Sequence, residues 1–300
     1  MANPGTGIVV VFYHPDDQCV GRANRFADFG LCVVVDNTEE ARSRAELGLE
    51  DRVVLISNGD NLGIATALNQ GIEYLIEAGC ERALLFDQDS EPSSELLEGL
   101  PRMLADELRN GRRVALLGPA YDDARLGGVA PFVRFGFPAL KRIAPEGTEP
   151  IEVDFLISSA SCLNLGAWRD IGPMDDSLFI DFVDVEWCVR ARAAHYSILG
   201  TPLLSLRHSL GGEPIRVLGR AYPSHSPLRH YYLFRNATNL IMRGYMPWTW
   251  KWTEIVAMPV RLVIYGLWLT PRLEHVRMAC LGIWHGLLGQ MGAFRKIQRL

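Results

Sequence analysis

Two carboxylates separated by one residue directly follow a short apolar run, in the sequence Ala83-Leu84-Leu85-Phe86-Asp87-Gln88-Asp89. The run predicts a buried strand, because it is continuously apolar, too short for a helix and followed by a Ser-Glu-Pro turn signal. Asp87 and Asp89 then lie just past the carboxyl end of that strand, where open α/β sheets bind ligands. Two hard oxygen ligands suit Mg²⁺ or Mn²⁺, which proteins commonly share with substrate phosphates. A solvated acidic turn is the alternative interpretation of an isolated Asp-x-Asp.

A second acidic cluster, Asp181, Asp184 and Glu186, crowds the start of a predicted helix. Carboxylates there complement the helix dipole, so a purely structural role is the alternative. A carboxylate among aromatic and aliphatic neighbours is nevertheless a reasonable general base. Downstream, a predicted strand ends at His208, whose imidazole is either an ordinary polar contact or a ligand to Mn²⁺ beside the Asp-x-Asp.

The elements that must position these residues alternate between strands and helices. Strands are predicted at residues 7–13, 31–35, 52–56, 83–86 and 113–117, with helices at 16–29, 62–78 and 94–108 between them. This order predicts βαβ units and a parallel sheet with both faces covered. Residues 120–150 predict a long loop with a hairpin, and residues 151–157 a further strand.

Three of these strands end in polar residues on one edge of the predicted sheet: Asp36, the Asp60-Asn61 pair and the Asp87/Asp89 pair. No Gly-x-Gly-x-x-Gly follows the first strand and no Walker pattern is present, which excludes the common phosphate-binding loops. An acidic edge repels phosphate, so a nucleotide diphosphate bound there needs a cation.

Composition narrows the class of protein. The net charge of -5 argues against nucleic acid as a partner. The six cysteines are scattered without a Cys-x-x-Cys, which predicts small buried residues in a reducing compartment. The first residues lack a basic segment followed by a long apolar one, so we expect a cytoplasmic chain without a secretory signal.

The last 60 residues differ from the rest, with eight Lys/Arg, two Asp/Glu and five of the seven Trp. Their apolar run is interrupted by Pro259 and Arg261, so a membrane-spanning helix is not expected. Aromatic residues mixed with Lys and Arg favour a helix lying in a membrane interface. The alternative is a helical subdomain or a homodimer contact.

Taken together, these segments resemble inverting glycosyltransferases of family 2, which have the GT-A fold, and more narrowly the bacterial rhamnosyltransferases that use dTDP-L-rhamnose. The resemblance spans roughly residues 8–240 in the family's order. It rests on Val35-Asp36-Asn37, Asn61-x-Gly63 with Asn69-x-Gly71, Phe86-Asp87-Gln88-Asp89, the segment from Phe179 to Arg190, His208-Ser209-x-Gly211, and His230-Tyr231-Tyr232-x-x-Arg235-Asn236.

The resemblance implies a role for each matching residue. Asp36 would bond the pyrimidine N3–H, and the segment around Asp60, Asn61 and Gly63 would line the nucleoside pocket. The metal would be held by Asp89 and His208, with Asp87 facing either the ribose or the metal. Asp184 would be the catalytic base, although Val183 precedes it where the family commonly has Glu. Arg235 and Asn236 would hold the donor phosphates or the acceptor.

The sequence therefore predicts a mostly parallel α/β sheet of the GT-A type over residues 1–240 and a helical extension over 241–300. The expected activity is transfer of a sugar, L-rhamnose by preference, onto a cell-surface polysaccharide or a lipid-linked glycan. The cofactor would be Mg²⁺ or Mn²⁺, and the protein would lie on the cytoplasmic face of the plasma membrane. The alternatives are a UDP-sugar donor, a nucleotidyltransferase, and a non-catalytic subunit that binds nucleotide sugars.

Overall fold

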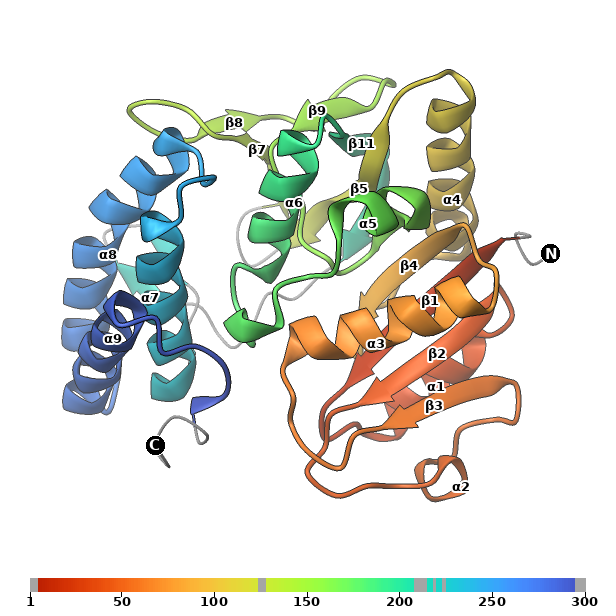
Figure 1. Cartoon of the computed structure of the whole chain (residues 1–300), viewed down its shortest axis with the longest axis horizontal. Helices are drawn as coiled ribbons and strands as arrows, with labels where there is room; N and C mark the ends of the chain where they lie inside the picture. Colours follow the sequence, from red (N-terminus) through yellow and green to blue (C-terminus); the bar gives the residue numbers. More distant parts are fainter. Residues whose placement is uncertain (1–4, 124–127, 208–214, 218–219, 223–224, 295–300) are drawn as a thin grey trace.

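The centre of the molecule is a mixed, mostly parallel sheet with helices on both faces (Figure 1), as the sequence predicted. This computed structural model describes residues 5–123, 128–207, 215–217, 220–222 and 225–294. The strand order is β3-β2-β1-β4-β10-β5-β11-β9, with β6 beside β5. The bounds are β1 Thr6–Phe12, β2 Leu31–Asp36, β3 Val53–Ser57, β4 Arg82–Asp87, β5 Val114–Asp123, β6 Gly128–Val129, β9 Ile151–Val153, β10 Ser161–Asn164 and β11 Ser197–Arg207.

Strand β4 shows why the apolar runs become central strands. Its side chains alternate between the two cores: Ala83 and Leu85 face one, and Leu84 and Phe86 face the other. All four are almost completely buried. A strand covered on both faces needs apolar residues at every position, which explains the continuous run.

Helices cover both faces of this sheet. Apolar residues of α1 and α4 pack on one face, and those of α3, α5 and α6 pack on the other. The bounds are α1 Asp17–Phe26, α2 Arg44–Leu47, α3 Ile64–Glu77, α4 Ser94–Arg109, α5 Leu165–Ile171, the short 3₁₀ helix η2 Asp176–Leu178 and α6 Val183–Ala193. The predicted helix starts agree with the caps, since Asp16 caps α1 and Ser93 caps α4.

The middle of the chain departs from the prediction. Strand β10 lies antiparallel between β4 and β5, in a segment for which the sequence predicted no strand. The strand predicted over residues 151–157 ends at Val153, where β9 pairs with β11. Of the predicted long loop, the described part holds the end of β5, strand β6, and a hairpin of β7 Phe132–Arg134 and β8 Lys141–Ile143. A second small hairpin joins β12 Ile215–Val217 to β13 Arg220–Tyr222.

Three further helices lie together at one side of the molecule (Figure 1, blue): α7 Pro227–Met242, α8 Trp248–Trp268 and α9 Arg272–Leu287. Helix α7 packs closely on α9, since the backbone of Gly282 and Gly286 lies against α7 with no space for a Cβ atom. Among the described helices, none is long and apolar enough to cross a membrane.

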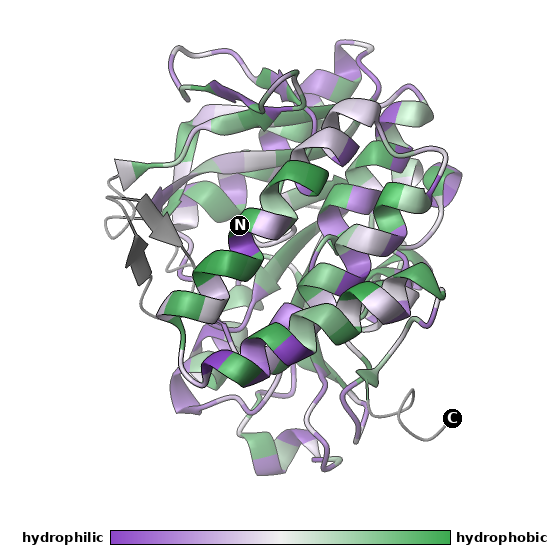
Figure 2. Cartoon of the chain, turned by 90° about the vertical axis from the view of Figure 1, so that its left-hand side faces the viewer, coloured by the Kyte–Doolittle hydropathy of each residue, from purple (hydrophilic) through white to green (hydrophobic). Residues whose placement is uncertain are grey.

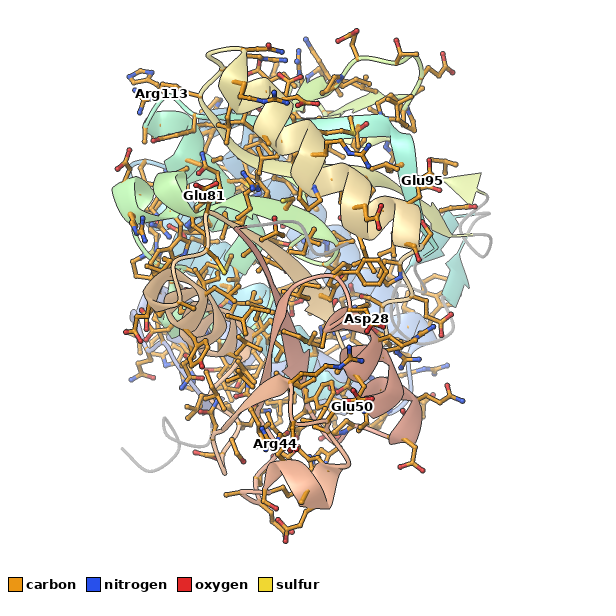
Figure 3. All side chains as sticks on the ribbon, turned by 90° about the vertical axis from the view of Figure 1, so that its right-hand side faces the viewer. Asp28, Arg44, Glu50, Glu81, Glu95 and Arg113 are labelled. Carbon is orange, nitrogen blue, oxygen red and sulfur yellow. The ribbon has the colours of Figure 1, made fainter. Side chains whose placement is uncertain are left out.

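The opposite end of the sheet is a polar surface. Strand β3 is the edge strand there, and the exposed side chains of Asp28, Arg44 and Glu50 lie around it (Figure 3). Charged residues beside an edge strand discourage pairing with another chain. The β3 end of the sheet is therefore a charged surface, whereas helices α8 and α9 on the other side expose large apolar residues.

Candidate active site

A cavity of about 590 Å³ opens where the parallel strands β1 and β4 end. Its wall combines the turn after β4, the segment that leads into α6, and the first turn of α7. The residues that line it are Val11, Tyr13, Ile64, Leu68, Asp87, Gln88, Asp89, Ile157, Ser158, Ser159, Ile180, Asp181, Phe182, Val183, Asp184, His225 and Arg229. Carboxylates from segments about 100 positions apart in the chain therefore share one cavity.

The turn that carries Asp87 and Asp89 is held from two directions. The amide of Gln88 accepts from the backbone N–H of Tyr13 at 2.8 Å and donates to its carbonyl at 3.1 Å. The buried side chain of Arg22 on α1 donates to the backbone carbonyl of Gln88 at 2.9 Å. These contacts fix the backbone between the two carboxylates, so both are presented to the cavity.

The donor set at this turn fits a hard divalent cation. Mg²⁺ is commonly bound through one or two carboxylates together with substrate phosphates, which is what Asp87 and Asp89 offer. No group of three or more His, Cys, Asp or Glu residues in metal-binding proximity occurs among the described residues. His208, the third ligand expected from the sequence, lies outside them.

Asp184 lies in the first turn of α6, on the cavity wall. Burial raises the pKa of its carboxyl to about 6, opposed by backbone N–H groups and reinforced by the charge of Asp181. The Val185 N–H donates to its Oδ1 at 2.8 Å. An ionised carboxylate that is short of solvent and of cationic partners is a stronger proton acceptor than an ordinary surface Asp.

The segment before α6 is held in an unusual backbone conformation. Phe179, Asp181 and Phe182 have φ angles of 67°, 64° and 65°, in the left-handed region that non-glycine residues rarely adopt. Such strain costs about 1–3 kcal/mol at each residue and is concentrated at functional sites. This segment, residues 177–182, leads to Asp184, the residue that the sequence predicts to be the general base. We therefore call it the base loop.

The described part of the cavity wall carries one guanidinium, that of Arg229 in the first turn of α7. It donates to Asp181 Oδ1 through Nη2 at 3.1 Å and Nε at 3.3 Å. His225 lies near it on the same wall. Neither residue was predicted from the sequence, because a single Arg or His in a polar segment has no periodic signal. The only clue was their position next to the His230-Tyr231-Tyr232 segment.

Asp36 lies at the end of β2, completely buried and already fully bonded. Its Oδ1 accepts from the N–H and hydroxyl of Thr38, and its Oδ2 accepts from Nε and Nη2 of Arg42. A carboxylate has about four acceptor positions, so these four bonds fill them. A pyrimidine N3–H can therefore donate to Asp36 only if Arg42 or Thr38 gives up one of its hydrogen bonds to that carboxylate.

Gly63 supports the base loop. It caps α3 with φ +88°, and a Cβ atom there would lie 2.6 Å from the backbone oxygen of Phe179. The next residue, Ile64, donates its N–H to that same oxygen at 2.8 Å. Asn61 Oδ1 accepts from the Gly63 N–H at 3.0 Å, and Asp60 lies in the same half-buried turn. The segment predicted to line the nucleoside pocket thus contacts the loop that leads to Asp184.

Arg235 and Asn236 require a correction, because neither lines the cavity. Both are completely buried in α7, and their side chains bond backbone carbonyls of the base loop rather than facing the open space. In this structure their side chains therefore do not face the cavity in which a donor or acceptor would bind. The cationic residue of α7 that does reach the cavity is Arg229, two turns earlier.

Comparisons with known proteins cover nearly the whole chain. No family model matches it. It is 30% identical over 267 residues to the dTDP-rhamnosyl transferase RfbF of Shigella flexneri, with 88% of each chain covered. It is 21% identical over 304 residues to the low-salt glycan biosynthesis hexosyltransferase Agl10 of Haloferax volcanii, with 95% of this chain and 92% of the relative covered.

Solved structures share the fold at much lower identity. The GalNAc-T7 complex with UDP, GalNAc and Mn²⁺ matches 94% of this chain with a TM-score of 0.55 and 12% identity, and this chain spans 56% of that protein's length. Residues 1–349 of S. aureus TarS match 95% of this chain with a TM-score of 0.51 and 14% identity. At these identities the likeness concerns the fold alone.

Proposed function

The chain belongs to the glycosyltransferase family of the Shigella flexneri dTDP-rhamnosyl transferase, and on this premise we propose that it transfers L-rhamnose from dTDP-L-rhamnose with inversion. Its fold is the GT-A fold expected from the sequence. Because the chain belongs to this glycosyltransferase family, two alternatives considered from the sequence are set aside: a nucleotidyltransferase and a non-catalytic subunit that binds nucleotide sugars. The observation that carries the proposal is the shared cavity, which brings Asp184 together with the Asp87/Asp89 pair.

In the proposed reaction Asp184 acts as the general base. It takes the proton of an acceptor hydroxyl while that oxygen bonds to the anomeric carbon of the donor sugar. The bond from this carbon to the diphosphate oxygen breaks, and the nucleoside diphosphate leaves with the electron pair. A pKa of about 6 leaves Asp184 mostly ionised at neutral pH and still basic enough to accept the proton.

Asp87 and Asp89 would hold Mg²⁺ or Mn²⁺ together with the donor diphosphate, and His208 would complete the ligand set. The bound ion supplies stabilisation for the charge that develops on the leaving group. An acidic cavity needs such a cation, because Asp87, Asp89, Asp181 and Asp184 face it together. Arg229 would add a second positive charge for the diphosphate. For this, its guanidinium would release Asp181 and bond the diphosphate instead.

Asp36, Asp60, Asn61 and Gly63 are proposed to form the nucleoside subsite, at the ends of the neighbouring strands β2 and β3. Thymine and uracil present the same N3–H, so a contact with Asp36 alone does not separate dTDP from UDP donors. The proposed preference for dTDP-L-rhamnose is supported by the relative that is 30% identical, which is a dTDP-rhamnosyl transferase.

The proposed acceptor is a cell-surface polysaccharide or a lipid-linked glycan, and the proposed location is the cytoplasmic face of the plasma membrane. Support comes from the large apolar side chains exposed on α8 and α9. The ribbons of these helices face the viewer in Figure 2 and are coloured green at their hydrophobic residues. An apolar groove of about 360 Å³ lies between α7, α8 and α9 on this side. A homodimer formed through the same face is the competing proposal.

A donor screen tests the function. The full chain is incubated with dTDP- and UDP-sugars and Mg²⁺ or Mn²⁺, and binding and slow hydrolysis of each sugar nucleotide are measured. We expect the response to be largest for dTDP-L-rhamnose and to disappear with EDTA. A preference for a UDP-sugar would overturn the donor assignment, and no response to any sugar nucleotide would overturn the transferase.

A further inference from the structure

The base loop, residues 177–182, adopts a backbone conformation that its own residue types disfavour, so other parts of the chain must stabilise it. Three of its six residues are non-glycine residues with φ between 64° and 67°. Each such residue costs roughly 1–3 kcal/mol relative to the right-handed region. The loop leads directly into α6 and Asp184, so any relaxation of its backbone would move the base.

Asn236 gathers the carbonyl groups of this loop. Its Nδ2 donates to the backbone oxygens of Leu178 at 2.9 Å, Ile180 at 2.6 Å and Asp181 at 3.0 Å. Three carbonyls converge on one amide nitrogen only when the chain between them curls back on itself. The left-handed residues Phe179 and Asp181 provide that curl.

Arg235 holds the start of the same loop. Its Nη2 donates to the carbonyls of Leu178 at 2.9 Å and Ser177 at 3.2 Å, and its Nε donates to Asn236 Oδ1 at 2.9 Å. The side chain is 0% exposed, and a buried guanidinium is tolerated only where acceptors surround it. The Nε bond also fixes which way the Asn236 amide points, so its NH₂ group faces the loop.

The segment after α9 completes this arrangement. Arg235 Nη1 donates to the carbonyl of Gly292, and the Gly292 N–H donates to the carbonyl of Ser177 at 2.7 Å. The Phe294 N–H bonds the Tyr232 hydroxyl at 2.8 Å. The end of the described chain is thereby tied to α7 and to the base loop.

We propose that Arg235 and Asn236 are positioning residues that hold the base loop in its left-handed conformation and so place Asp184 on the cavity wall. This role rests on the proposed function of Asp184 as the base. It gives the buried Arg-Asn pair of α7 a task other than ligand contact. The C-terminal helices are then a scaffold for the active site as well as an apolar surface.

The test compares Asn236→Ala with Thr238→Ala in the full chain. Thr238 is a matched control, because it is buried two residues further along α7 and bonds only the Phe234 carbonyl of its own helix. We expect Asn236→Ala to lower kcat about 10- to 100-fold, since small displacements of a catalytic group have effects of that size. The KM for the donor and the affinity for dTDP should change less than threefold. Thr238→Ala should retain kcat.

Hydrogen exchange of residues 175–186 gives a second readout that needs no activity. Faster exchange there in Asn236→Ala, but not in Thr238→Ala, supports the proposal even if the donor screen fails. If Asn236→Ala does not fold, Asn236→Ser keeps one donor and should show a smaller kcat loss. Unchanged exchange, an equal kcat loss in the control, or a loss confined to dTDP affinity would overturn the positioning role.

Discussion

At the scale of single residues, Asp184 combines two properties that a general base needs. It is placed on the cavity wall, and burial raises the pKa of its carboxyl to about 6. Asp181 lies three residues earlier, and its carboxylate is paired with Arg229. The two carboxylates, one in the base loop and one in the first turn of α6, therefore differ in their bonding partners.

Replacing the base should separate binding from turnover. We expect Asp184→Asn to lower kcat at least about 100-fold, the usual contribution of a general base, while the affinity for dTDP is retained. Turnover assays and titration calorimetry with dTDP measure the two effects. Asp106→Asn on α4, outside the residues that line the cavity and with a side chain 47% exposed, is the control and should behave as the unaltered protein. Normal turnover in Asp184→Asn would contradict the base assignment.

The raised pKa of Asp184 predicts an acid limit to activity. The base acts when ionised, so kcat should fall about tenfold per pH unit below roughly pH 6 and level off above it. An ordinary aspartate, with a pKa of 3.8, would place this limit about two units lower. The pH–rate profile between pH 4.5 and 8 distinguishes the two cases.

The same shift predicts the pH dependence of stability. A carboxyl whose pKa is raised by folding binds its proton more tightly in the folded state, so the folded state loses stability as pH rises from about 4 to above 6. Asp184→Asn removes this cost. We expect the variant to raise Tm relative to the unaltered protein at pH 8 and to leave it nearly unchanged at pH 4. A rise of equal size at both pH values would contradict the assigned pKa.

At the scale of elements, the start of α3 and the base loop are packed backbone against backbone. Gly63 makes this contact possible, because a Cβ atom there would lie 2.6 Å from the Phe179 oxygen. The sequence placed Gly63 in the nucleoside pocket, whereas its observed contact is with the loop that precedes Asp184. This glycine thus joins the turn that precedes α3 to the loop that precedes Asp184.

We expect Gly63→Ala to destabilise the fold by more than the roughly 1–3 kcal/mol of a strained backbone alone, since the base loop must also move. Gly79→Ala is the matched control: its φ is +82°, but its Cβ would meet open space. Chemical denaturation gives the free energies of unfolding, and kcat shows whether the base loop still places Asp184 correctly. Equal losses of stability with kcat retained in both variants would show that the contact with Phe179 is not needed.

At the scale of the whole molecule, two surfaces of opposite character lie apart. The β3 end is charged, while α8 and α9 expose large apolar side chains such as Val263, 58% exposed, and Trp284, 58% exposed. Within α8 the charged pair Glu254 and Arg261 bond each other and leave the outer apolar face uninterrupted. A surface of this kind is typical of a protein or membrane contact.

We expect the full chain to co-sediment with vesicles that contain anionic phospholipid, because basic residues such as Lys251 and Arg277 accompany the apolar face. Val260→Glu combined with Leu267→Glu should reduce binding at least tenfold. Tyr74→Glu, which alters an exposed apolar residue of α3, should not. If the double variant instead turns a dimer into a monomer and vesicle binding is absent throughout, this face is a contact between two copies.

The sequence was sufficient for strands β1 to β5 and for helices α1, α3 and α4, because the burial of apolar residues produces local sequence patterns. The short helix α2 was not predicted. The run at Ala83-Leu84-Leu85-Phe86 needed both sheet faces covered, and Asp87 at its end had to reach the carboxyl edge. The four-residue strand β10 was missed, because pairing on both sides stabilises it more than its own sequence does.

By itself, the sequence thus determined the α/β class, the strand ends at one edge of the sheet and the carboxylates that reach this edge, since each depends on neighbours a few positions away. Only the tertiary structure decided the roles of the polar residues of α7. Arg229 and Arg235 are the same residue type on one helix, yet one faces the cavity and the other bonds carbonyls more than 50 positions away. The difference arises from which side of α7 meets the base loop, and that is fixed by the packing of the whole chain.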